Sequence, residues 1–174
     1  MNLKKRTFEE VRESLRGKVI LVVNRGIPAR RICRSISERF EAVSAMTVTD
    51  IDKTQPAAAS AQELILLGSD PRAYLNLERI IELAKQRDVV AMHPGWGFAS
   101  EDMLFPKLAE EAGITFIGAS ADAMYKLGNK VQARIIARQV GVPVVPGSDD
   151  SVTVEQARAI IEEIGLLIML KAEG

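Results

Sequence analysis

The segment from Lys18 to Phe40, KVILVVNRGIPARRICRSISERF, decides the fold class. Residues 18–23 form a continuous apolar run that is rich in β-branched side chains, which is typical of a strand buried on both faces of a sheet. Asn24-Arg25-Gly26 then predicts a turn, and residues 32, 36 and 40 lie along one apolar face of a helix. A buried strand, a tight turn and a helix in this order are typical of the βαβ units of a parallel sheet.

The chain repeats this alternation up to residue 117. Further strands are predicted at Ala42–Val48, Glu63–Leu67, Val89–Met92 and Ile114–Ile117, and further helices at Ala57–Ala61, Leu75–Gln86 and Glu101–Ala112. We therefore expect an α/β fold with a Rossmann-like parallel sheet and helices on both faces.

The alternation of strands and helices does not extend to the segments on either side of this region. Thr7 and Glu10 have the spacing of a capping box, so residues 1–17 are predicted to be a helical extension. After residue 119, helices are expected at Ala121–Leu127, Lys130–Val140 and Val154–Ile164, followed by a strand at Leu166–Leu170. We therefore predict three parts: 1–17, a Rossmann-like domain at 18–119, and the start of another domain at 120–174.

Composition excludes several classes of protein. Of the 174 residues, 47% are hydrophobic, and 23 basic side chains balance 23 acidic ones. These values argue against disorder, and a net charge of zero argues against a nucleic-acid arm or a membrane-surface patch. No apolar run approaches the length of a membrane-spanning helix. Cys33 has no second cysteine to pair with and is expected to be a small buried hydrophobe. A reducing, cytoplasmic compartment is the default expectation.

The first turn lacks the glycines of a dinucleotide site. G-x-G-x-x-G lets a backbone approach a pyrophosphate, whereas here Gly26 is the single glycine between Asn24 and Ala29. Asp50 and Asp52 follow the second predicted strand, where a nucleotide-binding fold holds a ribose. Without the glycines, we expect them to be acidic residues of a surface loop.

The loop HPGWGF, residues 93–98, follows the fourth predicted strand. Ligands bind at this edge of open α/β sheets, and Gly95 and Gly97 free the backbone while Trp96 supplies an apolar wall. The alternative is a rigid turn whose rings fill the core. His93 is more typical of a hydrogen-bonded structural histidine than of a general base, because a base needs a nearby partner.

Two lysines stand at places that suit an anion. Lys130 follows Gly128-Asn129 at a predicted helix start, where backbone amides and the helix dipole favour negative charge. Lys171 follows the last predicted strand, so its ammonium group is expected at a strand end. For both residues the alternative is an ordinary solvated lysine.

Several motifs in this order resemble the N-terminal part of biotin carboxylases, the ATP-grasp ligases that carboxylate biotin. The matching segments are VVNRG (22–26), HPGWGFASE (93–101), FIG (116–118), LGNK (127–130), GVPVVPG (141–147) and LKAEG (170–174). Departures from the family pattern are Ile27 in place of a glutamate, Trp96 where bacterial enzymes commonly have tyrosine, and Asn129 in place of an aspartate.

The resemblance implies a Rossmann-like domain, the pre-ATP-grasp domain, followed by the first elements of an ATP-grasp domain. In the family, the positions that match Lys130 and Lys171 hold ATP phosphates, and the loop at Gly95, Trp96 and Gly97 faces the active-site cleft. The family uses ATP, Mg²⁺ and bicarbonate to carboxylate biotin on a carrier protein or domain. Its other partners are a carboxyltransferase component and a second copy in a homodimer, within acyl-CoA carboxylase systems of fatty acid metabolism.

The resemblance also limits what this segment is expected to do. The family's metal ligands and catalytic residues match positions beyond Gly174, so we expect no catalytic residue and no metal ligand here, and no activity of the segment alone. The rival hypothesis is a non-catalytic nucleotide-binding or dimerisation module with the same α/β fold.

Overall fold

A computed structural model describes residues 6–148, 150–165 and 167–170. The chain divides into two compact units, residues 1–124 and residues 125–174. The domain boundaries that the sequence suggests at 17/18 and 119/120 stay predictions.

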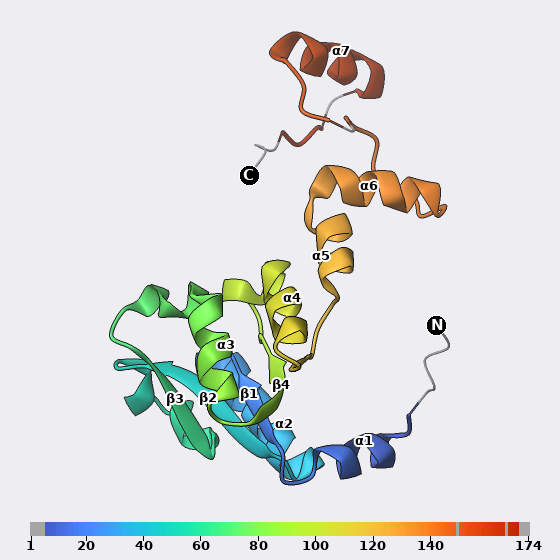
Figure 1. Cartoon of the computed structure of the whole chain (residues 1–174). Helices are drawn as coiled ribbons and strands as arrows, with labels where there is room; N and C mark the ends of the chain where they lie inside the picture. The colour runs from blue at the N-terminus through green and yellow to red at the C-terminus, as the bar shows by residue number, and fades with distance from the viewer. Residues whose placement is uncertain (1–5, 149, 166, 171–174) are drawn as a thin grey trace. The chain divides into compact units, whose positions relative to one another are not determined.

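The first unit is built on a five-stranded sheet, as Figure 1 shows. Its strands are β1 (Val19–Val22), β2 (Val43–Thr49), β3 (Glu63–Gly68), β4 (Val89–His93) and β5 (Thr115–Phe116). They lie in the order β3-β2-β1-β4-β5, and every neighbouring pair is parallel. The prediction of a parallel α/β sheet is confirmed.

One helix precedes the first strand, and helices and 3₁₀ turns connect the strands. They are α1 (Phe8–Leu15), α2 (Gly26–Phe40), η1 (Asp52–Thr54), η2 (Ala58–Ser60), η3 (Pro71–Leu75), α3 (Leu77–Lys85), η4 (Phe98–Glu101) and α4 (Leu104–Glu111). The helix expected at Ala57–Ala61 is thus a short 3₁₀ turn. The one expected at Glu101–Ala112 begins later, because the Asp102 carboxylate accepts a hydrogen bond from the Leu104 amide at 2.9 Å in a turn before α4.

Apolar side chains on the two faces of the sheet form two cores. On one face, Ile20 and Val22 of β1 pack with Cys33 and Ile36 of α2. On the other face, apolar residues of β1 and β4 pack against α3 and α4, and Phe105 of α4 lies edge-on to Phe116 with ring centroids 5.3 Å apart. Helices therefore cover both faces, as predicted (Figure 1). β1 is buried on both sides, which explains its uninterrupted apolar sequence.

The predicted capping box at the start of α1 is present. The Glu10 amide donates to the Thr7 hydroxyl at 3.2 Å, and the Thr7 amide donates to the Glu10 carboxylate at 2.7 Å. Phe8 packs against Phe40 of α2 with ring centroids 5.5 Å apart, and Arg12 pairs with Glu41 just after α2. Helix α1 is thus attached to the end of α2 that is remote from the turn at residues 24–26.

The second unit contains helices α6 (Lys130–Gln139) and α7 (Val154–Ile164), and α5 (Ala121–Gly128) runs from the first unit into it. The strand predicted at Leu166–Leu170 is wrong for residues 167–170, which are exposed and have no regular structure. A strand requires a neighbour for its backbone hydrogen bonds, and among residues 125–148, 150–165 and 167–170 no segment forms one.

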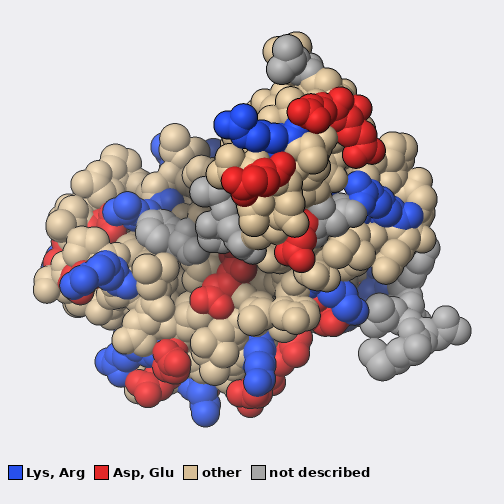
Figure 2. Space-filling model, turned by 90° about the horizontal axis from the view of Figure 1, so that it is seen from above, with Lys and Arg blue, Asp and Glu red and all other residues tan. Residues whose placement is uncertain are grey.

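Charged residues of both signs lie on the face shown in Figure 2, in keeping with 23 of each sign in the sequence. Within the described ranges, no helix combines the length and the apolar character needed to cross a membrane.

The buried thiol of Cys33 generates a prediction about stability and pH. Burial raises the pKa of this thiol from 9.0 to about 11, so between these values the unfolded chain loses the proton while the folded chain keeps it. The contribution to stability is therefore complete below pH 9 and is lost as pH rises through 11, by up to about 3 kcal/mol. Urea unfolding at about pH 8 and about pH 10.5 should show a larger loss for the native sequence than for Cys33→Ala; equal losses would contradict the assignment.

Candidate functional site

The order of the strands creates a topological switch point between β1 and β4. The chain leaves β1 toward β2 on one side, continues to β3, and then crosses back to place β4 on the other side of β1. Connections leaving the carboxyl ends of two such strands diverge, and ligands of open α/β sheets bind in the crevice between them. At this point the segment after β1 is Asn24-Arg25-Gly26, and the segment after β4 is the loop 94–97.

The side chain of Asn24 joins these two segments. Its residue is 2% exposed, and its amide nitrogen donates to the carbonyl oxygens of Pro94 and Trp96, both at 2.8 Å. Its amide oxygen accepts from the backbone N–H of Arg25 at 2.8 Å. Next to it, the Val23 amide donates to the His93 carbonyl at 2.9 Å, which continues the strand pairing up to the loop. Both hydrogens of the Asn24 amide nitrogen are thus donated to carbonyl oxygens of the loop.

His93 has a structural role in the same loop. Its Nδ1 accepts a hydrogen bond from the Gly95 amide at 2.9 Å, so in the neutral ring the proton is on Nε2. Burial lowers the pKa of His93, which favours this neutral, accepting form. The interpretation of His93 as a hydrogen-bonded structural residue agrees with this contact.

The three loop residues that the sequence singled out, Gly95, Trp96 and Gly97, differ in their surroundings. Gly95 and Gly97 have φ of 69° and 70°, a left-handed conformation that favours glycine. A Cβ on Gly95 would lie 2.5 Å from the Asn24 amide nitrogen, whereas a Cβ on Gly97 would meet open space. The Trp96 residue between them is 79% exposed. The alternative in which this ring fills the core is therefore wrong, and the indole projects from the switch point.

A second group of side chains lies where β2 ends. Asp52 accepts from the Thr49 hydroxyl at 2.6 Å and from the Tyr74 hydroxyl at 2.9 Å, and its side chain is 12% exposed. The Arg25 guanidinium lies 3.8 Å from the Asp52 carboxylate and 6.0 Å from the centre of the Tyr74 ring. Burial, together with the bond to Asp52, raises the pKa of Tyr74.

This group corrects the interpretation of Asp52. The sequence suggested two surface acids, and Asp50 fits that description because it pairs with Lys53 at 2.8 Å with both side chains nearly half exposed. Asp52 instead is largely enclosed by a hydroxyl-donating threonine and tyrosine. Tyr74 lies 22 residues further along the chain, so local sequence gave no signal of this contact.

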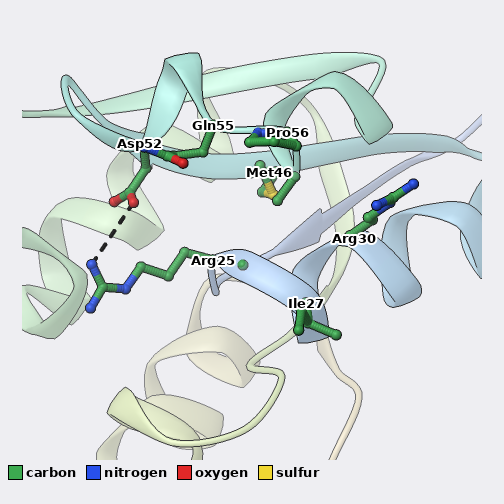
Figure 3. Close-up of a pocket in the computed structure, with 9 residues that line it drawn as sticks. Arg25, Ile27, Arg30, Met46, Asp52, Gln55 and Pro56 are labelled. Atoms are coloured by element: carbon green, nitrogen blue, oxygen red, sulfur yellow. Dashed lines mark ion pairs between the residues drawn. The ribbon is translucent and has the colours of Figure 1, made fainter.

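A pocket of about 420 Å³ lies between the start of α2 and the turns after β2 (Figure 3). Ile27, Met46 and Pro56 contribute apolar walls, and Arg30 lies at one side. Arg25 extends toward Asp52, with which it pairs, as the dashed line in Figure 3 marks. The pocket has the size of ordinary ligand sites. The turn at residues 24–26 borders the pocket and has a single glycine, however, so side chains stand where a pyrophosphate needs bare backbone.

Lys130 is the first residue of α6, as predicted. The amides at this helix start are only partly available, because the Asn129 side chain accepts from the Val131 and Gln132 amides at 2.9 and 3.1 Å. An anion at this end would therefore rely more on the ammonium group than on free amides. Lys171 lies outside the described residues.

The described residues hold no cluster of candidate metal ligands. Within 6–148, 150–165 and 167–170, no three His, Cys, Asp or Glu side chains gather as metal ligands. Sequence reasoning identified the loop at Gly95, Trp96 and Gly97 and placed Lys130 at a helix start. It missed Asn24 as a contact of the loop, although a polar residue directly after a fully buried strand is a signal that could have suggested it.

Comparison with known proteins supplies the family. Residues 16–124 match the family described as biotin carboxylase, N-terminal domain. The chain is 40% identical over 159 residues to the 2-oxoglutarate carboxylase small subunit of Hydrogenobacter thermophilus, covering 90% of this chain and 34% of that protein. It is 39% identical over 158 residues to biotin carboxylase 2 of Bacillus subtilis, covering 89% of this chain and 35% of that protein.

A solved structure agrees with this. The dimeric biotin carboxylase domain of the Hydrogenobacter thermophilus 2-oxoglutarate carboxylase, in complex with MgADP, ADP and bicarbonate, superposes with a TM-score of 0.80 at 38% identity. The match covers 86% of this chain and 33% of that one. The chain thus spans about a third of the length of the relatives it matches. From the match over residues 16–124 and these identities, the chain belongs to the biotin carboxylase N-terminal domain family.

Proposed function

We propose that this chain is the N-terminal segment of a biotin carboxylase, which uses ATP and bicarbonate to carboxylate biotin on a carrier protein or domain. The observation that carries the proposal is about 40% identity over nearly the whole chain to proteins of this activity. The relative that binds MgADP and bicarbonate has the same fold over the aligned region, which supports ATP, Mg²⁺ and bicarbonate as the small-molecule partners.

The acceptor of the carboxyl group and the protein partners form a finer part of the proposal. The resemblance suggests an acyl-CoA carboxylase system of fatty acid metabolism with a separate carboxyltransferase component. The relatives also include proteins named for 2-oxoglutarate and pyruvate. The proposal therefore commits to the carboxylation of biotin and does not depend on which molecule then receives the carboxyl group. A homodimer is supported by the dimeric relative. A cytoplasmic location is part of the proposal as the default for a chain whose single cysteine cannot form an internal disulfide.

Lys130 and Lys171 are proposed to contact the ATP phosphates. An ammonium group carries three donors and a full positive charge, which suits the phosphate oxygens on which charge develops during phosphoryl transfer. Lys130 stands at the start of α6, where the helix dipole adds to its charge. Trp96 and its two glycines are proposed to face the cleft in which biotin is carboxylated.

The first prediction compares this chain with a longer polypeptide that continues it with the remaining two thirds of Bacillus subtilis biotin carboxylase 2. The longer polypeptide should hydrolyse ATP when bicarbonate and biotin are added. The 174-residue chain alone should not, because the described residues provide no group of metal ligands to balance charge on the transferred phosphoryl group. Phosphate release is measured for both polypeptides, with and without bicarbonate. Bicarbonate-dependent hydrolysis by the short chain would overturn this division of roles.

The second prediction concerns Lys130→Met in the longer polypeptide. Methionine keeps an apolar stem but removes the ammonium group, so a charge-assisted contact of about 1.5–3 kcal/mol is lost. The Michaelis constant for ATP should then rise about tenfold or more, and those for bicarbonate and biotin should change much less. Lys171→Met should act in the same direction.

A matched control for these variants is Lys107→Met, which removes an exposed lysine of α4 that lies outside the proposed site. Initial rates at varied ATP measure all three variants. Unchanged ATP constants in both Lys130→Met and Lys171→Met would remove these residues from the site.

A further inference from the structure

We infer that Asn24 is a positioning residue that fixes the loop 94–97, and with it Trp96, in a single conformation at the switch point. The contact itself rests on the geometry of this chain. Its consequence for catalysis rests on the proposed function, because only that function places a substrate beside Trp96.

The hydrogen bonds of Asn24 determine which way its amide group faces. The nitrogen donates both of its hydrogens, to the carbonyls of Pro94 and Trp96, and the oxygen accepts from the Arg25 amide. Rotating the amide by half a turn would place its oxygen 2.8 Å from two carbonyl oxygens, and its nitrogen against an N–H group. All three contacts therefore favour one orientation, in which both donors face the loop.

Burial makes these contacts strong. Asn24 is 2% exposed, so water does not compete for its donors, and two loop carbonyls would lose their partner if the amide moved away. Gly95 packs so closely on the amide that even a methyl group does not fit between them. The loop is thus held by hydrogen bonds on both sides of Gly95 and by direct contact in the middle.

The acceptor side of Asn24 is held in turn by Arg25. The Arg25 guanidinium lies 3.8 Å from the Asp52 carboxylate, an ion pair that Figure 3 shows, and 6.0 Å from the centre of the Tyr74 ring. Asp52 is fixed by Thr49 and Tyr74. These contacts restrict the turn at residues 24–26, so the Arg25 amide stays where the Asn24 oxygen needs it.

A fixed loop matters because the Trp96 residue is exposed. Its carbonyl oxygen accepts from Asn24, and the amide of the preceding Gly95 donates to His93. Displacing a positioning group by about 1 Å costs up to about a hundredfold in rate. The Asn24 amide does not need to touch substrate to have this effect. It acts through the Trp96 carbonyl.

The test uses the single tryptophan of the chain as its reporter. Asn24→Asp keeps the size of the side chain, but a carboxylate has no donor, and even a protonated carboxyl donates one hydrogen bond in place of two. In the 174-residue chain, time-resolved fluorescence anisotropy should show the fast, nanosecond component of Trp96 motion rise about twofold or more in amplitude.

The matched control is Asn76→Asp. Asn76 begins α3 by accepting a hydrogen bond from the Arg79 amide at 3.1 Å, a role that aspartate performs equally well. This variant should leave the anisotropy decay unchanged. Equal decays in the native chain and in Asn24→Asp, with both folded by circular dichroism, would overturn the inference.

A second pair of variants tests the same contact from the loop side if Asn24→Asp does not fold. Gly95→Ala and Gly113→Ala both place alanine at a positive φ, 69° and 73°, but only the first drives a methyl group against Asn24, because a Cβ on Gly113 meets nothing within 4 Å. Gly95→Ala should therefore lower the urea midpoint clearly more than Gly113→Ala. Equal midpoints would contradict the close packing on which the inference depends.

The catalytic consequence is measured in the longer polypeptide. Asn24→Asp should lower kcat/KM for biotin about tenfold or more, while the Michaelis constant for ATP changes less than about twofold, because the proposed ATP contacts lie on other residues. If Asn24→Asp increases the mobility of Trp96 but leaves the biotin kinetics unchanged, the positioning role in catalysis is overturned. The hydrogen bonds between Asn24 and the loop would then still hold the loop in place. An inactive native polypeptide would count against the proposed function alone, since the fluorescence result still decides the inference about Asn24.

Discussion

Two backbone carbonyls of the loop after β4 find their hydrogen-bond donors in one buried amide, that of Asn24. The rest of the first unit can be understood from this contact. It requires β1 and β4 to be neighbours, a glycine at position 95, and a turn after β1 that presents asparagine inward. An unpaired carbonyl at this depth would be costly, so the sheet order and the loop conformation stabilise each other.

The contact also explains why the site differs from a dinucleotide fold. Dinucleotide sites leave the first turn bare so that a pyrophosphate can approach the backbone. Here the same turn is occupied by its own side chains: Asn24 faces the loop after β4, and Arg25 faces Asp52 at the end of β2. The first turn of this sheet therefore fixes the protein's own loops, and the exposed Trp96 is left to face outward.

Much of the fold could be predicted from local sequence, since apolar runs and helical faces mark β1 to β5 and α1 to α7 within a few residues. What local sequence lacked was contact between distant segments. The sequence around Asn24 is that of an ordinary turn, and its role appears only when β4 lies beside β1. Asp52 likewise resembles a surface acid in the sequence, and its enclosure depends on the contact with the distant Tyr74. Residues 167–170 are apolar enough for a strand, but apolar character does not provide a neighbouring strand.

The position of β1 in the sheet has a consequence for synthesis of the chain. Pro94 lies 70 residues after Asn24, so the side of β1 that pairs with β4 stays open while those residues emerge from the ribosome. During that interval an apolar strand exposes unpaired backbone groups, which is a template for association with other chains. A nascent chain that stalls before Val89 is therefore expected to aggregate through β1, and chaperones should bind there until β4 arrives.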